Sequence, residues 1–307
     1  MVCGCGKTHN RGVGVCLTAV LMATLDPRLT PILTRVSEEA QVFAQKAPKF
    51  LGVERMKQKG RAAPPRFKVR FGADPKDAPE AGFKTTELVS EYAFGALKAA
   101  PHEIRELRRV VAVNGKPVRE KLRARLELAQ GMASDADRVN RQMLQDLEAH
   151  GLIGAATDLG QMLLMFQRPA LKDLEFDVRR LNDRIGNEPV TVLGYRQVGD
   201  RLGRIYHGRE MSRVALSGEL WVRQSDFIPL RITADLPVTE GKNSVLHQMT
   251  VEYAPGPQGV VLPTRTSYLR RQNALLLVET TAEYTDFKMF SADADIKFLA
   301  EGEDSQK

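Results

Sequence analysis

The sequence predicts an α+β fold in which a single, highly curved antiparallel sheet, an open half-barrel, wraps around helices. Three observations lead to this prediction. After Leu171 the chain consists almost entirely of short strand-like runs separated by turn signals. These runs alternate apolar and polar residues, which is typical of an antiparallel sheet with one buried face. Helical patterns occupy much of the chain before them, and such helices can cover the buried face of the sheet.

The first element is a helix over residues 27–46. Asp26 is a good N-cap, and Pro27 is tolerated at the first helical position. The apolar residues then recur at three- and four-residue spacing, as a helix requires: Leu29, Ile32, Leu33, Val36, Ala40 and Phe43. After Pro48 the chain has strand character over residues 50–59.

Residues 60–82 are rich in Gly, Ala, Pro, Asp and Lys and indicate a loop. Extended patterns return over residues 85–97 and 104–113. Asn114-Gly115 then provides a strong turn signal. Residues 119–150 indicate a charged helix, and a more apolar helix follows near residues 154–166, ending before Pro169.

The remaining strands are expected near residues 173–181, 189–198, 204–207, 214–223, 228–236, 244–254, 260–270 and 274–287. Alternation shows which of their residues share a face. One expected face of strand 214–223 contains Leu216, Gly218, Leu220 and Val222. The matching face of the next strand contains Ile228, Leu230, Ile232 and Ala234.

The N-terminus has the layout of a secretory signal. Lys7 and Arg11 precede an apolar run over residues 12–25, which is too short to span a membrane. We therefore expect a leader over residues 1–25, a domain over 26–300 and a disordered tail over 301–307. Cleavage after Ala23, acylation of Cys16, and a retained apolar leader on a cytosolic protein remain open alternatives.

The cysteines agree with export to a periplasmic or cell-envelope location. All three, Cys3, Cys5 and Cys16, lie in the expected leader, so the body has no thiol chemistry. A body without thiols suits an oxidising compartment. The net charge of +7 comes from 45 basic residues interleaved with 38 acidic ones. A nucleic-acid binder would gather its basic residues in a stripe, so we expect no nucleic-acid partner but weak attraction to anionic membrane surfaces.

Four local patterns have residue types that occur in sites of chemistry, and none is expected to be catalytic. Residues 4–8 imitate the end of a phosphate-binding loop but lack its first glycine and its preceding strand. The leader cysteines with His9 match zinc ligands by residue type only. His207 lies near Arg209 and Glu210, a combination suited to acid–base chemistry, but we favour a polar turn between strands. Trp221 beside Arg223 and Arg231 suggests outer-face binding or, as we favour, cross-strand packing. The expectation is a non-enzymatic protein with no cofactor and no metal.

A methionine-rich segment, Gln161–Phe166, has two interpretations. Flexible, polarizable side chains suit a surface that accepts varied apolar ligands, but ordinary core packing, the interpretation we favour, explains them as well. On the first interpretation, residues 154–167 form a plug or lid over the concave face of the sheet. The residues expected to bind the ligand are then Met162, Met165, Phe166, Leu220, Val222, Leu230, Ile232, Met249 and Val251.

Three segments resemble the LolA/LolB-like half-barrel proteins of bacterial envelopes, a group that includes the sensor domain RseB. Gly218–Ile232 looks like the strand–turn–strand of that family, with an acidic turn followed by Pro-Leu-Arg. Gly259–Thr264 is similar to the start of the following strand, and Tyr284–Phe290 to the closing strand. The resemblance covers about residues 170–298, while the helical segment 119–167 is longer than a minimal carrier has.

The resemblance implies a carrier-like protein of the periplasm or outer membrane that binds a lipid or a lipoprotein acyl chain in a concave cavity. A structural or regulatory module that docks an envelope protein and binds no small ligand is the alternative. A hydrolase is a third and less favoured class.

Overall fold

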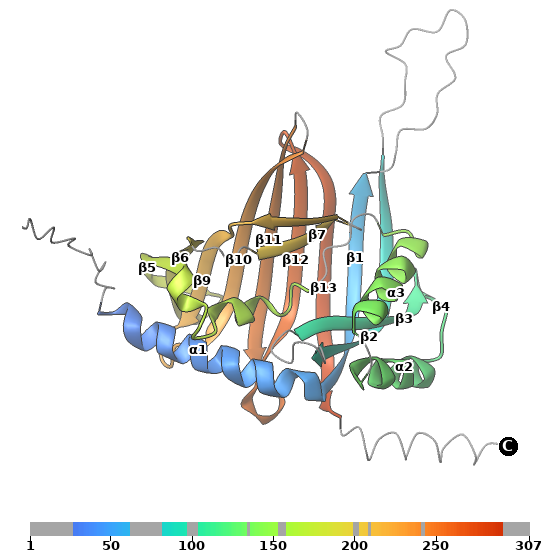
Figure 1. Cartoon of the computed structure of the whole chain (residues 1–307), viewed down its shortest axis with the longest axis horizontal. Coiled ribbons are helices and arrows are strands. Elements are labelled where there is room, and N and C mark those ends of the chain that lie inside the picture. Colours follow the sequence, from blue (N-terminus) through green and yellow to red (C-terminus); the bar gives the residue numbers. More distant parts are fainter. Residues whose placement is uncertain are drawn as a thin grey trace, which may run out of the picture.

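The computed structural model describes residues 27–61, 82–96, 104–133, 136–152, 158–198, 203–207, 210–240 and 243–290 (Figure 1). Its helices are α1 (Leu29–Lys46), α2 (Lys121–Ala133) and α3 (Ala136–Ala149), with 3₁₀ turns η1 (Ala47–Lys49), η3 (Met162–Phe166), η4 (Leu171–Asp173) and η5 (Pro257–Gly259). The strands of the first half are β1 (Phe50–Arg61), β2 (Phe83–Ala96), β3 (Ile104–Val113) and β4 (Lys116–Pro117). Those of the second half are β5 (Leu174–Ile185), β6 (Glu188–Gln197), β7 (Gly203–His207), β8 (Glu210–Val214), β9 (Ser217–Arg223), β10 (Pro229–Glu240), β11 (Asn243–Pro255), β12 (Val261–Gln272) and β13 (Leu275–Met289).

Eleven strands form one open antiparallel sheet in the order β4-β3-β2-β1-β13-β12-β11-β10-β9-β6-β5. Most neighbours are consecutive in the chain. The first exception is the pairing of β1 with β13, which places the first strand beside the last. The second is the pairing of β6 with β9, because the separate hairpin β7-β8 is inserted between them. Figure 1 shows the strands bending around the helices, so the α+β half-barrel architecture predicted from the sequence is confirmed.

The sheet has a concave face that is covered by α1. This helix buries Leu29, Ile32, Leu33, Val36, Ala40 and Phe43, the residues that the sequence pattern predicts. It runs across the strands in Figure 1 and extends from the β5 end toward β2. At its C-terminal end the Phe43 ring contacts Phe94 of β2 edge-on, with 5.1 Å between ring centroids. The concave face and α1 share one hydrophobic core.

The predicted helix over residues 119–150 is wrong as a single element, because the structure has two helices there. Leu128 of α2 packs with Ala93 and Leu107, which lie on the outer face of β2 and β3. Met143 and Leu147 of α3 instead join the main core on the inner face. The two helices therefore pack on opposite faces of the sheet, and one straight helix cannot do this.

Other sequence predictions are met closely where the structure describes the chain. Each predicted strand has a counterpart, and Asn114 and Gly115 both have positive φ (47° and 78°), as a tight hairpin turn requires. Of the apolar helix expected near 154–166, the described residues 158–166 contain only the 3₁₀ turn η3, and residues 153–157 lie outside the described part. The leader over 1–25, most of the loop over 60–82 and the tail over 301–307 also lie outside it. None of the described helices is long and apolar enough to cross a membrane.

Candidate functional site

The ligand-binding residues predicted on the strands lie on the concave face, with one exception. Five of the six ligand-binding residues predicted on β9–β11 are at most 6% exposed and belong to the shared core: Leu220, Val222, Ile232, Met249 and Val251. The sixth is Leu230. The exception arises from an irregular register between β9 and β10.

Leu230 leaves the expected face because of that irregularity. Pro229 pairs with Val222 and Arg231 pairs with Trp221, so the register shifts by one residue between Pro229 and Arg231. Pro229 is therefore buried opposite Val222, while Leu230 is only half-buried. The strict alternation assumed from the sequence does not survive this bulge.

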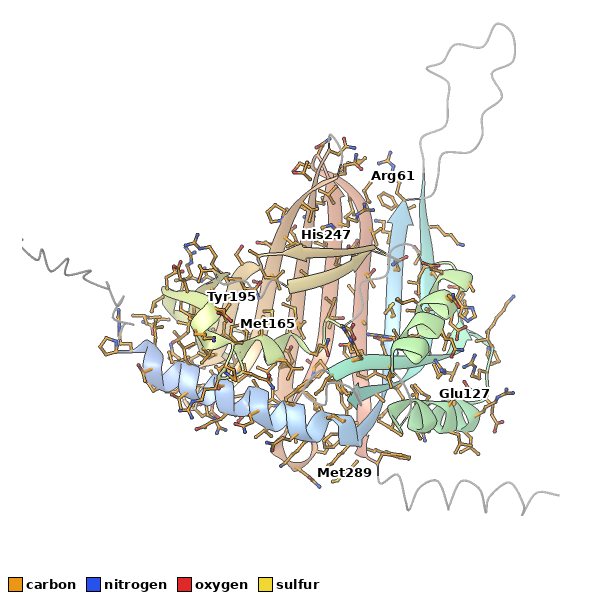
Figure 2. All side chains as sticks on the ribbon, in the orientation of Figure 1. Arg61, Glu127, Met165, Tyr195, His247 and Met289 are labelled. Atoms are coloured by element: carbon orange, nitrogen blue, oxygen red, sulfur yellow. The ribbon has the colours of Figure 1, made fainter. Side chains whose placement is uncertain are left out.

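The predicted residues of the methionine-rich segment belong to the same hydrophobic core as these strand residues. Met162 and Phe166 of η3 are buried, and Met165 is half-buried against the same core. The Phe166 ring meets Tyr195 of β6 edge-on, with 5.3 Å between centroids. Figure 2 shows Met165 and Tyr195 near α1, and His247 farther along the sheet. At these positions the concave face is filled by η3 and α1, which supports the core-packing interpretation of Met162.

A cleft of about 930 Å³ opens where this filling ends, between the N-terminal half of α1 and the edge strand β5. Its apolar wall has two sources. Leu29 and Leu33 are four residues apart and so share one side of α1. On the strand, alternation places Leu174, Phe176 and Val178 on the concave face.

The cleft exists because β5 is the last strand of the sheet. Among the described strands none covers its outer edge, so the inner residues of β5 face α1 next to solvent. A cleft of this volume with an apolar wall and a polar rim has the properties of small-molecule sites. None of the nine residues predicted to bind a ligand lines it. The signal available in the sequence was the alternation Leu174, Phe176, Val178 within a predicted strand.

The segment that leads to the cleft is fastened to the concave face by hydrogen bonds. The Glu106 carboxylate accepts from the backbone N–H groups of Asp158 (3.1 Å) and Gly160. Tyr253 accepts from the Leu163 N–H (3.0 Å) and donates to the Gly160 carbonyl (3.1 Å). A side chain at Gly160 would approach Glu106 Oε1 to 2.6 Å, so glycine is needed for this close contact.

Asp158 completes this attachment. Its Oδ1 accepts from the Glu106 N–H at 2.8 Å, and its Oδ2 lies 3.2 Å from Arg105 Nη1. Burial, reinforced by the Glu106 charge, raises the pKa of the Asp158 carboxyl. Residues 158–163 therefore lie on the concave face, as a plug or lid would, but they are held there by specific polar contacts.

Beneath this segment lies a buried ionic cluster formed by Glu54, Glu106 and Arg108. Arg108 Nε donates to both oxygens of Glu54 (3.0 and 2.8 Å), and its Nη2 donates to Glu106. All three side chains are at most 2% exposed. Arg108 reaches across β2 to do this, and the residue of β2 opposite Glu54 is the small Ser90. Because these buried charged groups pair with one another, they indicate a structural role in the sheet.

The structure describes little of the other patterns considered from the sequence. Among the described residues, no group of three metal-ligating side chains forms. The side chain of His207, and residues 4–8 with the three cysteines, lie outside the described part. His247 is fully buried, and its Nδ1 is 2.8 Å from Tyr268 Oη.

The outer face of the sheet also has a hollow, of about 910 Å³, but a charged one. Beside it, the Trp221 ring is contacted by the guanidinium groups of Arg180 and Arg231, each 5.1 Å from its centroid. The indole N–H donates to Glu219 at 3.2 Å. The ring contacts and the N–H hydrogen bond both show that Trp221 interacts with side chains of this chain, which supports the cross-strand packing interpretation.

Comparisons with known proteins give little beyond the fold. No protein-family model matches the chain, and no curated protein matches it. Among solved structures, the chain is similar to a LolA superfamily protein from Nitrosomonas europaea. The two share 13% identity and a TM-score of 0.32, over 84% of this chain and 94% of that one. A likeness this distant carries no argument about function.

Proposed function

We propose that this protein binds an apolar ligand, a lipid or an acyl chain, in the cleft between α1 and β5. The observation that supports the proposal is the cleft itself, whose wall is formed by aliphatic and aromatic side chains of the core. The proposal keeps the sequence-based expectation of a non-enzymatic protein of the bacterial envelope, reached through an N-terminal signal. It moves the expected ligand from the middle of the concave face, where η3 packs, to the β5 end.

The hydrophobic effect sets the scale of such binding. Each methylene group removed from water contributes about 0.8 kcal/mol, so ten of them contribute about 8 kcal/mol before the cost of ordering the chain. Affinity should therefore rise by about fourfold for each added methylene until the cleft is full. Short carboxylic acids should bind too weakly to detect.

The first experiment looks for a ligand that is already present. The full chain is purified from a bacterial host without detergent, and its organic extract is measured by mass spectrometry. A stoichiometric lipid is expected. Titration with a fluorescent fatty acid then measures uptake by protein from which the lipid has been extracted.

A variant pair locates the site. Val178→Trp fills the cleft from the inner face of β5, while Leu181→Trp adds the same ring on the exposed part of that strand. Val178→Trp should weaken uptake by about 15-fold, the equivalent of two lost methylene contacts, and Leu181→Trp should not. Equal affinities for the two variants would move the ligand out of this cleft.

A second candidate function is a periplasmic interaction module without a small ligand. The filling of the concave face by α1 and η3 favours it, since most residues expected to line a cavity are core residues. A folded protein that is extracted empty and takes up no fatty acid would support this alternative and refute ligand binding.

A further inference from the structure

The rim of the α1–β5 cleft has an uneven charge balance that bears on the headgroup of the ligand. Three basic residues line the cleft, Arg28, Arg168 and Lys172, together with three acidic ones, Glu38, Glu175 and Asp177. Equal numbers suggest neutrality, but the ion pairs of these side chains show otherwise.

Each acidic rim residue is paired with an arginine that lies outside the lining of the cleft. Glu175 binds Arg196, and Asp177 Oδ2 lies 2.9 Å from Arg179 Nε. Glu38 Oε2 lies 3.6 Å from Arg35 Nη1, and Glu38 shares this arginine with the buried Glu39. These exposed pairs add little stability, but each places a compensating positive charge beside a rim carboxylate.

Arg168 and Lys172 are not compensated in this way. Both are exposed, and neither has a carboxylate within 4.0 Å in the part of the chain that the structure describes. They lie four residues apart on the segment that leads from η3 through η4 into β5. Leu171, which also lines the cleft, is adjacent to Lys172, so the cationic and apolar parts of the lining are continuous.

We propose that Arg168 and Lys172 bind the anionic headgroup of an amphiphile whose acyl chain occupies the cleft. The guanidinium and ammonium groups supply hydrogen-bond donors and positive charge for a carboxylate, and the apolar wall receives the chain. A long-chain fatty acid is the occupant that this combination fits. The inference rests on the proposed function, because it assigns the headgroup of the ligand whose chain binds in the same cleft.

The test compares two ligands that share a chain and differ in head charge. Palmitate and hexadecanol each displace the neutral fluorescent probe N-phenyl-1-naphthylamine from the full chain, at low and at high salt. The wild type is compared with Arg168→Gln/Lys172→Gln. Two exposed ion pairs of up to about 1 kcal/mol each predict a loss of palmitate affinity of about 3- to 30-fold. Hexadecanol affinity should stay within about twofold, and only palmitate affinity should fall with added salt.

Lys49→Gln/Lys288→Gln is the matched control. It removes the same net charge from two exposed lysines at the opposite end of α1, about 27 Å from its first residue. This variant should bind palmitate as the wild type does. An equal loss in both double variants would show a general charge effect and overturn the headgroup site.

The outcomes separate the two proposals. A wild type that binds neither palmitate nor hexadecanol refutes the proposed function itself. Binding of both ligands with no difference between Arg168→Gln/Lys172→Gln and the control refutes only the headgroup site. A variant that keeps its palmitate affinity but loses binding to phosphatidylglycerol vesicles would assign the two cations to a membrane surface and also overturn the headgroup site.

Discussion

Removing Arg108 should be among the most damaging single changes in this sheet. Arg108→Met keeps most of the side-chain volume but leaves the carboxylates of Glu54 and Glu106 buried at no more than 1% exposure. Arg108 donates to both carboxylates, and hydrogen bonds to charged groups contribute about 1.5–3 kcal/mol each. Breaking a buried ion pair costs about 3–5 kcal/mol, so a loss of that size in the free energy of unfolding is expected.

The assay is urea denaturation of the full chain, followed by circular dichroism and by fluorescence of the single Trp221. The control is Glu54→Gln/Glu106→Gln/Arg108→Met, in which no charge remains buried in the cluster. This triple variant should recover most of the lost stability, because neutral groups cost far less to bury than unpaired ions. If Arg108→Met costs less than about 1 kcal/mol, or if the triple variant is the least stable of the three proteins, the reasoning is wrong.

Two further predictions concern a buried carboxyl and a glycine. Burial, which outweighs the attraction of Arg35, raises the pKa of Glu39 above its ordinary value of 4.5. Glu39→Gln should match the wild type below pH 4.5 and become the more stable protein as the pH rises through the folded-state pKa; thermal melts from pH 4 to 8 check this, and a pH-independent difference would contradict it. Gly218→Ala should cost about 1–3 kcal/mol, because its Cβ would lie 2.0 Å from the Thr233 carbonyl oxygen. Gly82→Ala, with open space around it, should change stability by less than about 0.5 kcal/mol, and equal urea midpoints for the two alanine variants would refute the steric argument.

The architecture was predictable because its signals are local. Helix α1 follows from the spacing of its apolar residues, and β11 from the alternation that buries Val245, Met249 and Tyr253. The bulge at the start of β10 was not predictable. It follows a turn in which Phe227 has φ 59°, a conformation that glycine and asparagine signal but phenylalanine does not.

The candidate site was less accessible to sequence reasoning for two reasons. The cleft depends on where α1 lies relative to the last strand of the sheet, and this is decided by tertiary packing. The buried charges depend on register. Glu54 and Arg108 lie in strands separated by β2, and charged residues in strands normally indicate a solvent-facing side. Only the alignment of three strands brings them together on the inner face.

The pairing of the first strand with the last bears on how the protein folds. Gln58 and Thr280 form a hydrogen bond at 3.1 Å although 222 positions separate them. The two arms of the sheet on either side of this seam are made largely of hairpins that form from neighbouring segments, whereas the seam needs both ends of the domain at once. Closing so long a loop is slow relative to hairpin formation. Until β13 reaches β1, each arm exposes one unpaired edge of a strand that is central in the finished sheet. The seam, rather than the outer edges of the finished sheet, is therefore where an incomplete chain is most open to incorrect pairing.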